Sequence, residues 1–360
     1  MSMRRFVSIW CRTSAAILSL HFATGFTAVR AGQPPVTEQA AARNESDNSL
    51  EVDGLDATEN GLPADAAANP THQEAPLPGA LAAPRDLKLI AKDRVVVHCT
   101  YWAGNRGKKT VPIILLHGWD GKLGAGSRQD LLELGQALQK AGHAVIAPDL
   151  RGHGQSDRRE LSENDVVMLD REAFRSQDIN DMLLDVEAAR RFLVEENNAE
   201  RLNLECLTVI GFDMSTVVAL NWILFDWTMP SFPTLKQGQD VKAFVLVSPD
   251  QAFRGMGTRQ ALSNPIVRGQ LSACVIYGAD DPAADAAKRI VNTLRRAHRP
   301  IPANPDDAVR FQDFYVHELA TRLHGTKLLN GPTLGLSEAI AQFIERRLVA
   351  QQVQFPWRKR

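Results

Sequence analysis

Apolar and polar positions follow two different periods along the chain from about residue 87 onward. Short, continuously apolar runs at 111–116, 207–211, 241–247 and 273–277 are typical of buried strands. Between such runs lie longer segments whose apolar residues recur on one helical face, most clearly at 178–196. Buried strands that alternate with amphipathic helices predict an α/β fold, with a mostly parallel sheet covered by helices on both faces.

The same two periods predict the remaining elements. Strands are expected at 87–91 and 95–101, paired as a hairpin, and at 143–147 and 311–319, which gives a sheet of about eight strands. Helices are expected at 130–141, 215–227, 282–297 and 337–349.

The first 85 residues have a different composition. Residues 1–31 combine a basic start, a short apolar segment and small residues near Ala31, which predicts a cleaved signal peptide and export to the periplasm or the extracellular space. Residues 32–85 are rich in Ala, Pro and acidic residues, and too few large apolar side chains are present to offset the entropy of ordering. We therefore expect a disordered acidic linker, a folded domain at 86–352, and a short basic tail at 353–360 that is solvated.

The net charge and the cysteine content indicate which partners and cofactors are not expected. A formal net charge of -1 gives no basic excess for nucleic acid, and no apolar run is long enough for a stable membrane span. Beyond the predicted signal peptide, Cys99, Cys206 and Cys274 all lie in runs that we interpret as strands, so buried, unreactive thiols are expected. No Cys/His cluster has the spacing of a metal site, and neither a metal nor an organic cofactor is expected. The oligomeric state stays open.

Four motifs follow predicted strands in one order along the chain. They are His117-Gly118-Trp119, the Asp-x-Arg-Gly-His-Gly turn at 149–154, the segment 209–215, and the Gly-x-x-Asp turn at 278–281, which His324 follows later. In the third motif an apolar run is followed by Asp213, which stands two residues after Gly211 and two residues before Ser215. A potential nucleophile between two small residues at this spacing is the layout of a nucleophile elbow. Together the motifs resemble the α/β-hydrolase superfamily over roughly residues 86–350.

The resemblance implies a role for each matching residue. Asp213 would be the nucleophile, His324 the base and Asp281 the acid that orients it, in the chain order of the superfamily. The backbone N–H groups of Trp119 and Met214 would form the oxyanion hole. Asp250, which follows another strand, stays an alternative acid, and His317 is a competing base that lies inside a predicted strand.

The nucleophile is Asp instead of the usual Ser, and this changes the expected chemistry. A carboxylate is ionised at neutral pH, so it can attack an electrophilic carbon and form an ester, which a water activated by His324 would then hydrolyse. Epoxide hydrolases and haloalkane or haloacid dehalogenases of the superfamily work in this way. The resemblance therefore implies a hydrolase that acts on a small electrophilic substrate, such as an epoxide, a halide or an ester-like compound.

Three features depart from those enzymes. Met214 stands where dehalogenases commonly place a donor for the halide, and Tyr101, Tyr277 and Tyr315, the candidates for protonating an epoxide oxygen, all lie in predicted strands. The stretch at about 249–271, where a cap would be inserted, leaves room only for a minimal cap.

Two alternatives to this hydrolase therefore remain. The first is a degenerate hydrolase fold that serves as a binding or scaffold protein, in which side chains would fill the space around Asp213. The second is a serine-type esterase with an atypical nucleophile, although the position of Ser215 in the first turn of a helix favours a structural role. His117 and His153 are expected to stabilise turns.

Overall fold

The computed structural model describes residues 81–121, 124–230, 236–331 and 333–360. These residues belong to one compact unit, which spans Thr71–Arg360. The predicted signal peptide and nearly all of the predicted linker lie outside the described residues. Within the described ranges, no helix is long and apolar enough to cross a membrane.

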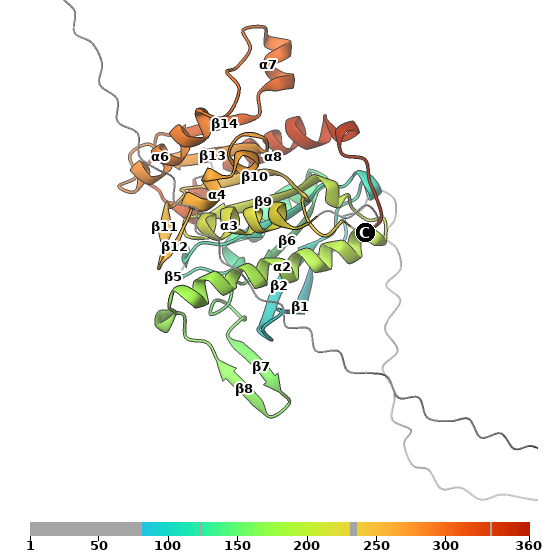
Figure 1. Cartoon of the computed structure of the whole chain (residues 1–360), viewed down its shortest axis with the longest axis vertical. Coiled ribbons are helices and arrows are strands. Elements are labelled where there is room, and N and C mark those ends of the chain that lie inside the picture. The colour runs from blue at the N-terminus through green and yellow to red at the C-terminus, as the bar shows by residue number, and fades with distance from the viewer. Residues whose placement is uncertain (1–80, 122–123, 231–235, 332) are drawn as a thin grey trace, which may run out of the picture. The chain divides into compact units, whose positions relative to one another are not determined.

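An eight-stranded sheet forms the centre of this unit (Figure 1). Its spatial order is β1 (Arg85–Ile90), β2 (Val96–Trp102), β6 (Ala144–Pro148), β3 (Pro112–Leu116), β9 (Leu207–Phe212), β10 (Val241–Val247), β13 (Ser272–Gly278) and β14 (Phe314–Leu319). Strands β1 and β2 pair antiparallel, β2 pairs antiparallel with β6, and every pair from β6 to β14 is parallel. The prediction of a mostly parallel sheet of about eight strands is confirmed.

Parallel pairing brings the carboxyl ends of five strands to one edge of the sheet. Leu116 pairs with Gly211, Val247 pairs with both Phe212 and Ile276, and Gly278 pairs with Leu319. The loops that follow β3, β9, β10, β13 and β14 therefore leave the sheet side by side, which is where open α/β sheets place their functional groups.

Helices cover the two faces of the sheet and bury a separate apolar layer on each. On one face lie α2 (Ser176–Asn198), α3 (Ser215–Thr228) and α6 (Ala284–Arg295), and on the other lie α1 (Leu132–Lys140) and α8 (Leu336–Ile344). Ile179, Met182 and Val186 of α2 are fully buried, as the helical spacing of this segment predicts. The sequence pattern therefore located the face that α2 buries.

The short cap is confirmed as well. Strands β11 (Ala252–Phe253) and β12 (Met256–Gly257) and helices α4 (Arg259–Ser263) and α5 (Pro265–Gly269) fill the stretch between β10 and β13. A second two-stranded ribbon, β4 (Asp120–Gly121) and β5 (Gly124–Ala125), follows the first motif.

Some sequence-based boundaries are wrong. The last strand begins at Phe314 and not at residue 311, because a short helix, α7 (Pro305–Phe311), begins with a proline that suits a first helical turn. Cys206 lies in a 3-10 turn, Leu204–Cys206, directly before β9, whereas Cys99 and Cys274 lie in strands; all three are buried and free. A hairpin of β7 (Arg158–Ser162) and β8 (Asp165–Met168) was not expected, because its exposed side chains carry no apolar–polar period.

Only part of the tail at 353–360 is solvated as expected: Val353 is 96% exposed, whereas Trp357 and Arg360 contact the domain. The Trp357 indole N–H donates to the carbonyl of Leu202 at 3.1 Å, and Lys108 lies over the Trp357 ring. The Arg360 side chain is only 3% exposed and forms an ion pair with the buried carboxylate of Asp240. The tail therefore packs onto the domain through an aromatic contact and a buried charge pair, which a basic composition alone does not indicate.

Candidate functional site

The turn between β9 and α3 holds Asp213 in a conformation that exposes its side chain at the carboxyl edge of the sheet. Its φ is 42°, in the left-handed region that L-residues with a Cβ rarely adopt. The turn is fixed by Ser215, whose hydroxyl accepts from the Phe212 N–H and donates to the Leu116 carbonyl, each at 2.9 Å. Ser215 is fully buried, so it serves the structural role expected from its position and is not an exposed nucleophile.

The two predicted oxyanion donors converge on Asp213 itself. The Trp119 N–H donates to Asp213 Oδ1 at 3.2 Å, and the Met214 N–H donates to the same oxygen. These donors therefore already bind a side-chain oxygen, and the position between them is not vacant. The physical reason is that a carboxylate carries a second oxygen, and this oxygen occupies the position that a serine would leave empty.

Two cations hold the loop that supplies the Trp119 donor. The Arg171 guanidinium donates to the Trp119 carbonyl at 2.6 Å, and the guanidinium carbons of Arg171 and Arg254 lie 5.0 and 4.3 Å from the centroid of the Trp119 ring. Arg254 lies in the turn between β11 and β12, so the short cap is linked directly to the oxyanion loop.

His324 is paired with Asp281. Its Nδ1 lies 2.6 Å from Asp281 Oδ2, while Asp281 Oδ1 accepts the Ala283 N–H at 2.9 Å in the turn that leads into α6. A carboxylate on Nδ1 places the ring proton there and leaves Nε2 as the basic nitrogen. The structure thus pairs His324 with Asp281 and gives no such hydrogen bond to Asp250, the alternative acid.

A cavity of about 250 Å³ joins these groups. It is lined by Trp119, Asp120, Asp213, Asp250, Phe253, His324 and Lys327. The space beside Asp213 is therefore open, although Asp213 itself is only 8% exposed. Five of its lining side chains can ionise: three carboxyl groups, one imidazole and one ammonium group.

Burial perturbs both inner carboxyl groups. It raises the pKa of Asp213 to about 6, with a smaller upward contribution from the charge of Asp250, against the lowering effect of the Met214 and Trp119 donors and of His324. Burial and the charge of Asp281 also raise the pKa of Asp250, against the attraction of His324. Perturbed carboxyl groups that share a cavity are typical of functional sites.

Two glycines that the sequence analysis gave no site role allow the close packing around Asp213. A Cβ at Gly118 would overlap Asp213 Oδ2, and a Cβ at Gly325 would lie 3.1 Å from the same oxygen. Gly325 also has a φ of 56°, and its N–H donates to the Ser248 hydroxyl at 3.0 Å. Each of these glycines directly follows a histidine of a motif, His117 or His324, and this position in the sequence could have indicated a role at the site. Nothing in the sequence indicated Phe253 or Lys327.

The other candidate residues lie away from the cavity. His117 Nε2 accepts from the Leu150 N–H at 3.0 Å and His153 Nδ1 lies 3.0 Å from the Arg151 carbonyl, so both brace turns, and burial lowers their pKa values to about 4 and about 3. His317 lies within β14. Tyr101, Tyr277 and Tyr315 lie within β2, β13 and β14, and none of the three lines the cavity. In the described ranges, no group of three His, Cys, Asp or Glu side chains is arranged to hold a metal ion.

The fold and the place of this site define an α/β protein that carries its candidate functional groups in loops at the carboxyl edge of a mostly parallel sheet. The sequence pattern of the alpha/beta hydrolase fold matches residues 111–328, and the chain belongs to this family.

Solved structures agree with the fold. An esterase of Pyrococcus furiosus matches with a TM-score of 0.50 at 15% identity, over 74% of this chain and 92% of that chain. A putative alpha/beta hydrolase of Agrobacterium tumefaciens matches at 13% identity, over 74% of this chain and 98% of that chain, with a TM-score of 0.49. No curated protein matches the sequence. At 15% identity the match to the esterase bears on the fold alone, and the reaction is argued from the geometry of the site.

Proposed function

We propose that this protein is an exported hydrolase that attacks a small electrophilic substrate with Asp213 and then hydrolyses the resulting ester with His324 and Asp281. One observation carries the proposal. Asp213 Oδ1 receives both backbone N–H donors, Oδ2 receives no hydrogen bond from the described residues, and the carboxyl group lines an open cavity together with His324.

In the first step, Oδ2 attacks the electrophilic carbon. A bond forms between Oδ2 and that carbon, and the bond to the leaving group breaks with its electron pair, which gives an alkyl ester of Asp213. The raised pKa of Asp213 means that the carboxylate is ionised only above about pH 6, so attack slows below that pH.

In the second step, Nε2 of His324 accepts a proton from water, and the hydroxide attacks the Asp213 carboxyl carbon. The negative charge that develops on Oδ1 already faces the Trp119 and Met214 N–H groups, which stabilise it without rearrangement. The ester bond then breaks, the departing oxygen takes the proton from the His324 imidazolium and leaves as the alcohol, and the Asp213 carboxyl group loses its proton to water. Asp281 stabilises the imidazolium that forms on His324.

When the substrate is an epoxide, the alkoxide oxygen that is freed in the first step also needs a proton. Asp250 lines the same cavity, is not hydrogen-bonded to His324, and has a raised pKa, so in this proposal it supplies that proton. A departing halide would not need this step, and Asp250 would then be dispensable.

The two alternatives predict different behaviour. A serine-type esterase is disfavoured because Ser215 is buried and because the oxyanion hole already holds Oδ1. A scaffold protein would show no turnover and no covalent adduct with any electrophile.

The test is a hydrolysis screen over epoxides, haloalkanes, haloacids and activated esters, with the wild type, Asp213→Ala and His324→Gln. We expect turnover by the wild type only, and an adduct on the peptide that contains Asp213 in the His324→Gln variant, detected by mass spectrometry. In water enriched in ¹⁸O, a single turnover should place the label in Asp213 and not in the product, because water attacks the carboxyl carbon. Turnover that survives Asp213→Ala would reject the mechanism.

Export is proposed from residues 1–31 alone. Fractionation of the expressing cell, with N-terminal sequencing of the mature protein, tests it. A mature chain that retains Met1 would contradict cleavage.

A further inference from the structure

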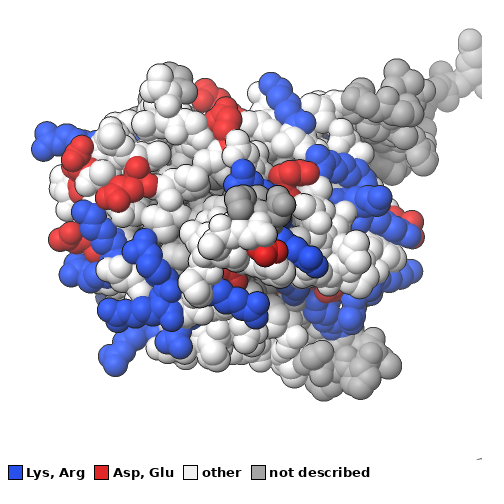
Figure 2. Space-filling view, turned by 90° about the horizontal axis from the view of Figure 1, so that it is seen from above, with Lys and Arg blue, Asp and Glu red and all other residues white. Residues whose placement is uncertain are grey.

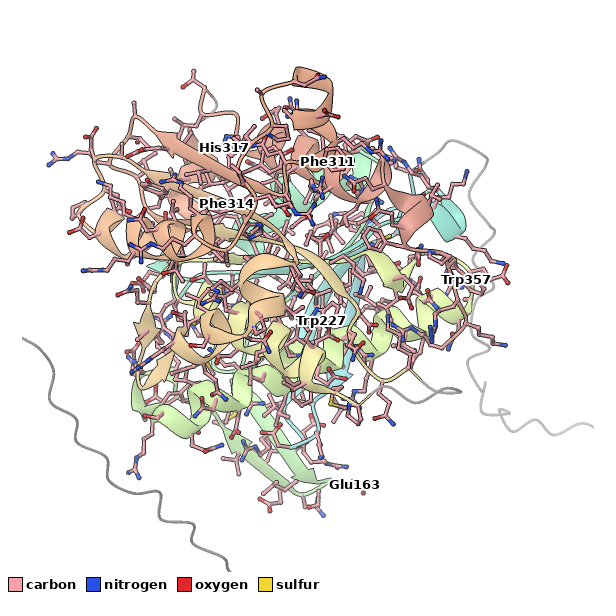
Figure 3. All side chains as sticks on the ribbon, turned by 45° about the horizontal axis from the view of Figure 1, so that its top comes forward. Glu163, Trp227, Phe311, Phe314, His317 and Trp357 are labelled. Carbon is pink, nitrogen blue, oxygen red and sulfur yellow. The ribbon has the colours of Figure 1, made fainter. Side chains whose placement is uncertain are left out.

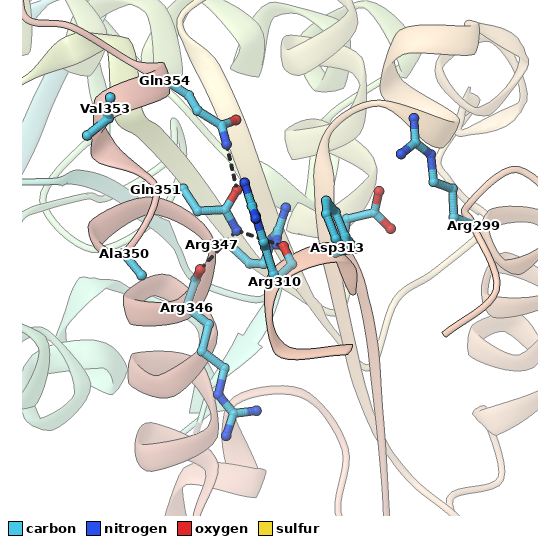
Figure 4. A pocket seen from close by; sticks show the side chains of 10 residues that line it. Arg299, Arg310, Asp313, Arg346, Arg347, Ala350, Gln351, Val353 and Gln354 are labelled. Carbon is cyan, nitrogen blue, oxygen red and sulfur yellow. Dashed lines mark hydrogen bonds between the residues drawn. The ribbon is translucent and has the colours of Figure 1, made fainter. Parts of the chain in front are cut away.

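Figure 4 shows an arginine-rich groove that shares no lining residue with the catalytic cavity. We call it the arginine groove. It has a volume of about 810 Å³ and contains Arg299, Arg310, Arg346 and Arg347, with the apolar side chains of Phe311 and Val353 among them. It lies by α7, the start of β14 and the end of the last helix, whereas the catalytic groups follow the carboxyl ends of the strands.

The cations of the groove lack partners of opposite charge. Arg299, Arg310 and Arg346 are exposed, and no described carboxylate forms an ion pair with any of the three. Asp313, the acidic residue in the lining, is already paired with His298 at 2.9 Å. Phe311 and Val353 are 43% and 96% exposed. Figure 2 looks onto the end of the molecule that carries α7, where Lys and Arg side chains predominate. The groove thus suits a partner that is both acidic and apolar.

The β7–β8 hairpin has the complementary character. Its exposed residues Leu161, Val166, Val167 and Met168 are apolar, and Glu163 and Asp165 at its turn form no ion pair in the described part of the chain. The base of the hairpin is anchored, since Glu160 N–H donates to the Arg94 carbonyl and Arg159 pairs with Asp93 at 2.8 Å. The hairpin therefore presents a preorganised acidic and apolar tip.

The two surfaces lie at opposite ends of the same compact unit. Figure 1 places α7 at one end of the view and the β7–β8 hairpin at the other, and Figure 3 labels Phe311 and Glu163 at these two ends. A hairpin and a groove so far apart cannot meet within one molecule, but they can meet between two.

We propose that the β7–β8 hairpin of one copy of this chain docks into the arginine groove of a second copy. Such a contact is heterologous, because each copy contributes a different surface, and it builds head-to-tail rings or chains. A hairpin tip in a groove buries less surface than a standard stable interface, so the association is weak and becomes weaker as salt screens the charges. The proposed contact between copies involves none of the residues that line the catalytic cavity.

The test combines two charge reversals in the full chain. The groove variant is Arg310→Glu/Arg346→Glu, and the hairpin variant is Glu163→Lys/Asp165→Lys. Sedimentation velocity of the wild type from about 1 µM to about 1 mM should show concentration-dependent association, consistent with a weak complex. Each variant alone should stay monomeric, since like charges then face each other. An equimolar mixture of the two variants should associate again, because every contact between unlike variants pairs opposite charges.

A matched control carries the same change in charge at the other edge of the sheet. Lys88→Glu/Lys92→Glu alters two exposed cations on β1 and the turn after it, and should associate like the wild type. A wild type that stays monomeric over the whole range overturns the proposal. So does a groove variant that associates normally, or a mixture that stays monomeric. Restored association in the mixture also shows that both variants are folded.

Discussion

Asp213 combines two unfavourable conditions at a single residue. Its backbone is held at a φ of 42°, which costs a non-glycine residue about 1–2 kcal/mol, and its carboxyl group is buried with a pKa of about 6. Neither condition helps the chain to fold. Strain and a perturbed pKa at one side chain that lines a cavity are typical of residues retained for function.

Replacement of Asp213 by Asn should therefore stabilise the protein at neutral pH. The pKa of Asp213 in the folded protein lies about two units above that of a free Asp side chain, so ionisation destabilises the folded state by up to about 3 kcal/mol above pH 6. As the pH falls from 6 to below 4, the wild type recovers this stability and the difference between the two proteins should vanish. Urea unfolding at pH 8 and at pH 4 measures it.

Asp120→Asn is the control for this experiment. Asp120 lines the same cavity, but its side chain is 74% exposed, so we expect a change of less than about 0.5 kcal/mol. An Asp213→Asn variant that is less stable than the wild type at pH 8 would contradict the interpretation.

At the scale of single elements, the start of α6 links folding to chemistry. One carboxylate, Asp281, accepts a backbone N–H in the turn before the helix and orients His324 with its other oxygen. A shift of this helix end would therefore move the base of the proposed reaction. The element positions the histidine as well as covering the sheet.

Two substitutions separate these roles of Asp281. Asp281→Ala removes both contacts and should lower the free energy of unfolding by about 1 kcal/mol and also abolish hydrolysis of the ester. Asp281→Asn keeps an oxygen for the Ala283 N–H, so it should retain stability yet slow ester hydrolysis by about 10²–10⁴-fold. The measurements are thermal unfolding and the decay of the Asp213 ester. Equal rates for Asp281→Asn and the wild type would remove Asp281 from the mechanism.

Some helices, strands and site residues could be predicted from the sequence, and others could not. The strand 241–247 was predicted to the residue, because a continuous apolar run has one stable environment, the middle of a sheet. Asp213, Asp281 and His324 were singled out because the motifs that contain them follow predicted strands in the chain order of the superfamily that they resemble. Lys327 and the close approach of Gly118 to Asp213 could not be found, since they depend on how loops far apart in the chain pack together. Phe311 was assigned to a strand because a short helix with a mixed surface leaves no clear period.

At the scale of the whole molecule, the final residues hold distant parts together. Asn197 of α2 donates to the Arg358 carbonyl at 2.9 Å, Asn203 donates to the Phe355 carbonyl at 2.8 Å, and Arg360 reaches Asp240 directly before β10. This tail therefore fastens the end of α2 to the entry of a central strand.

Arg360→Ala should destabilise the protein by about 2 kcal/mol, because it leaves the buried Asp240 with Arg190 and Lys236 as its remaining cations. Lys359→Ala, which removes the same charge from an exposed neighbour, should have almost no effect. Thermal unfolding compares the two. Equal melting temperatures would mean that the tail pairs without contributing to stability.

The occupied pair of N–H donors has a final chemical consequence. Phosphonyl and boronyl inhibitors of serine hydrolases form a bond to the serine and place an oxygen between such donors. Here Asp213 replaces the serine, and its Oδ1 already occupies the position between the donors. We therefore expect that phosphonyl and boronyl inhibitors of serine hydrolases do not label or inhibit the protein. Asp213→Ser would remove Oδ1 from the position between the donors. A single substitution therefore separates a site that has no room for the oxyanion of an inhibitor from one that can bind it.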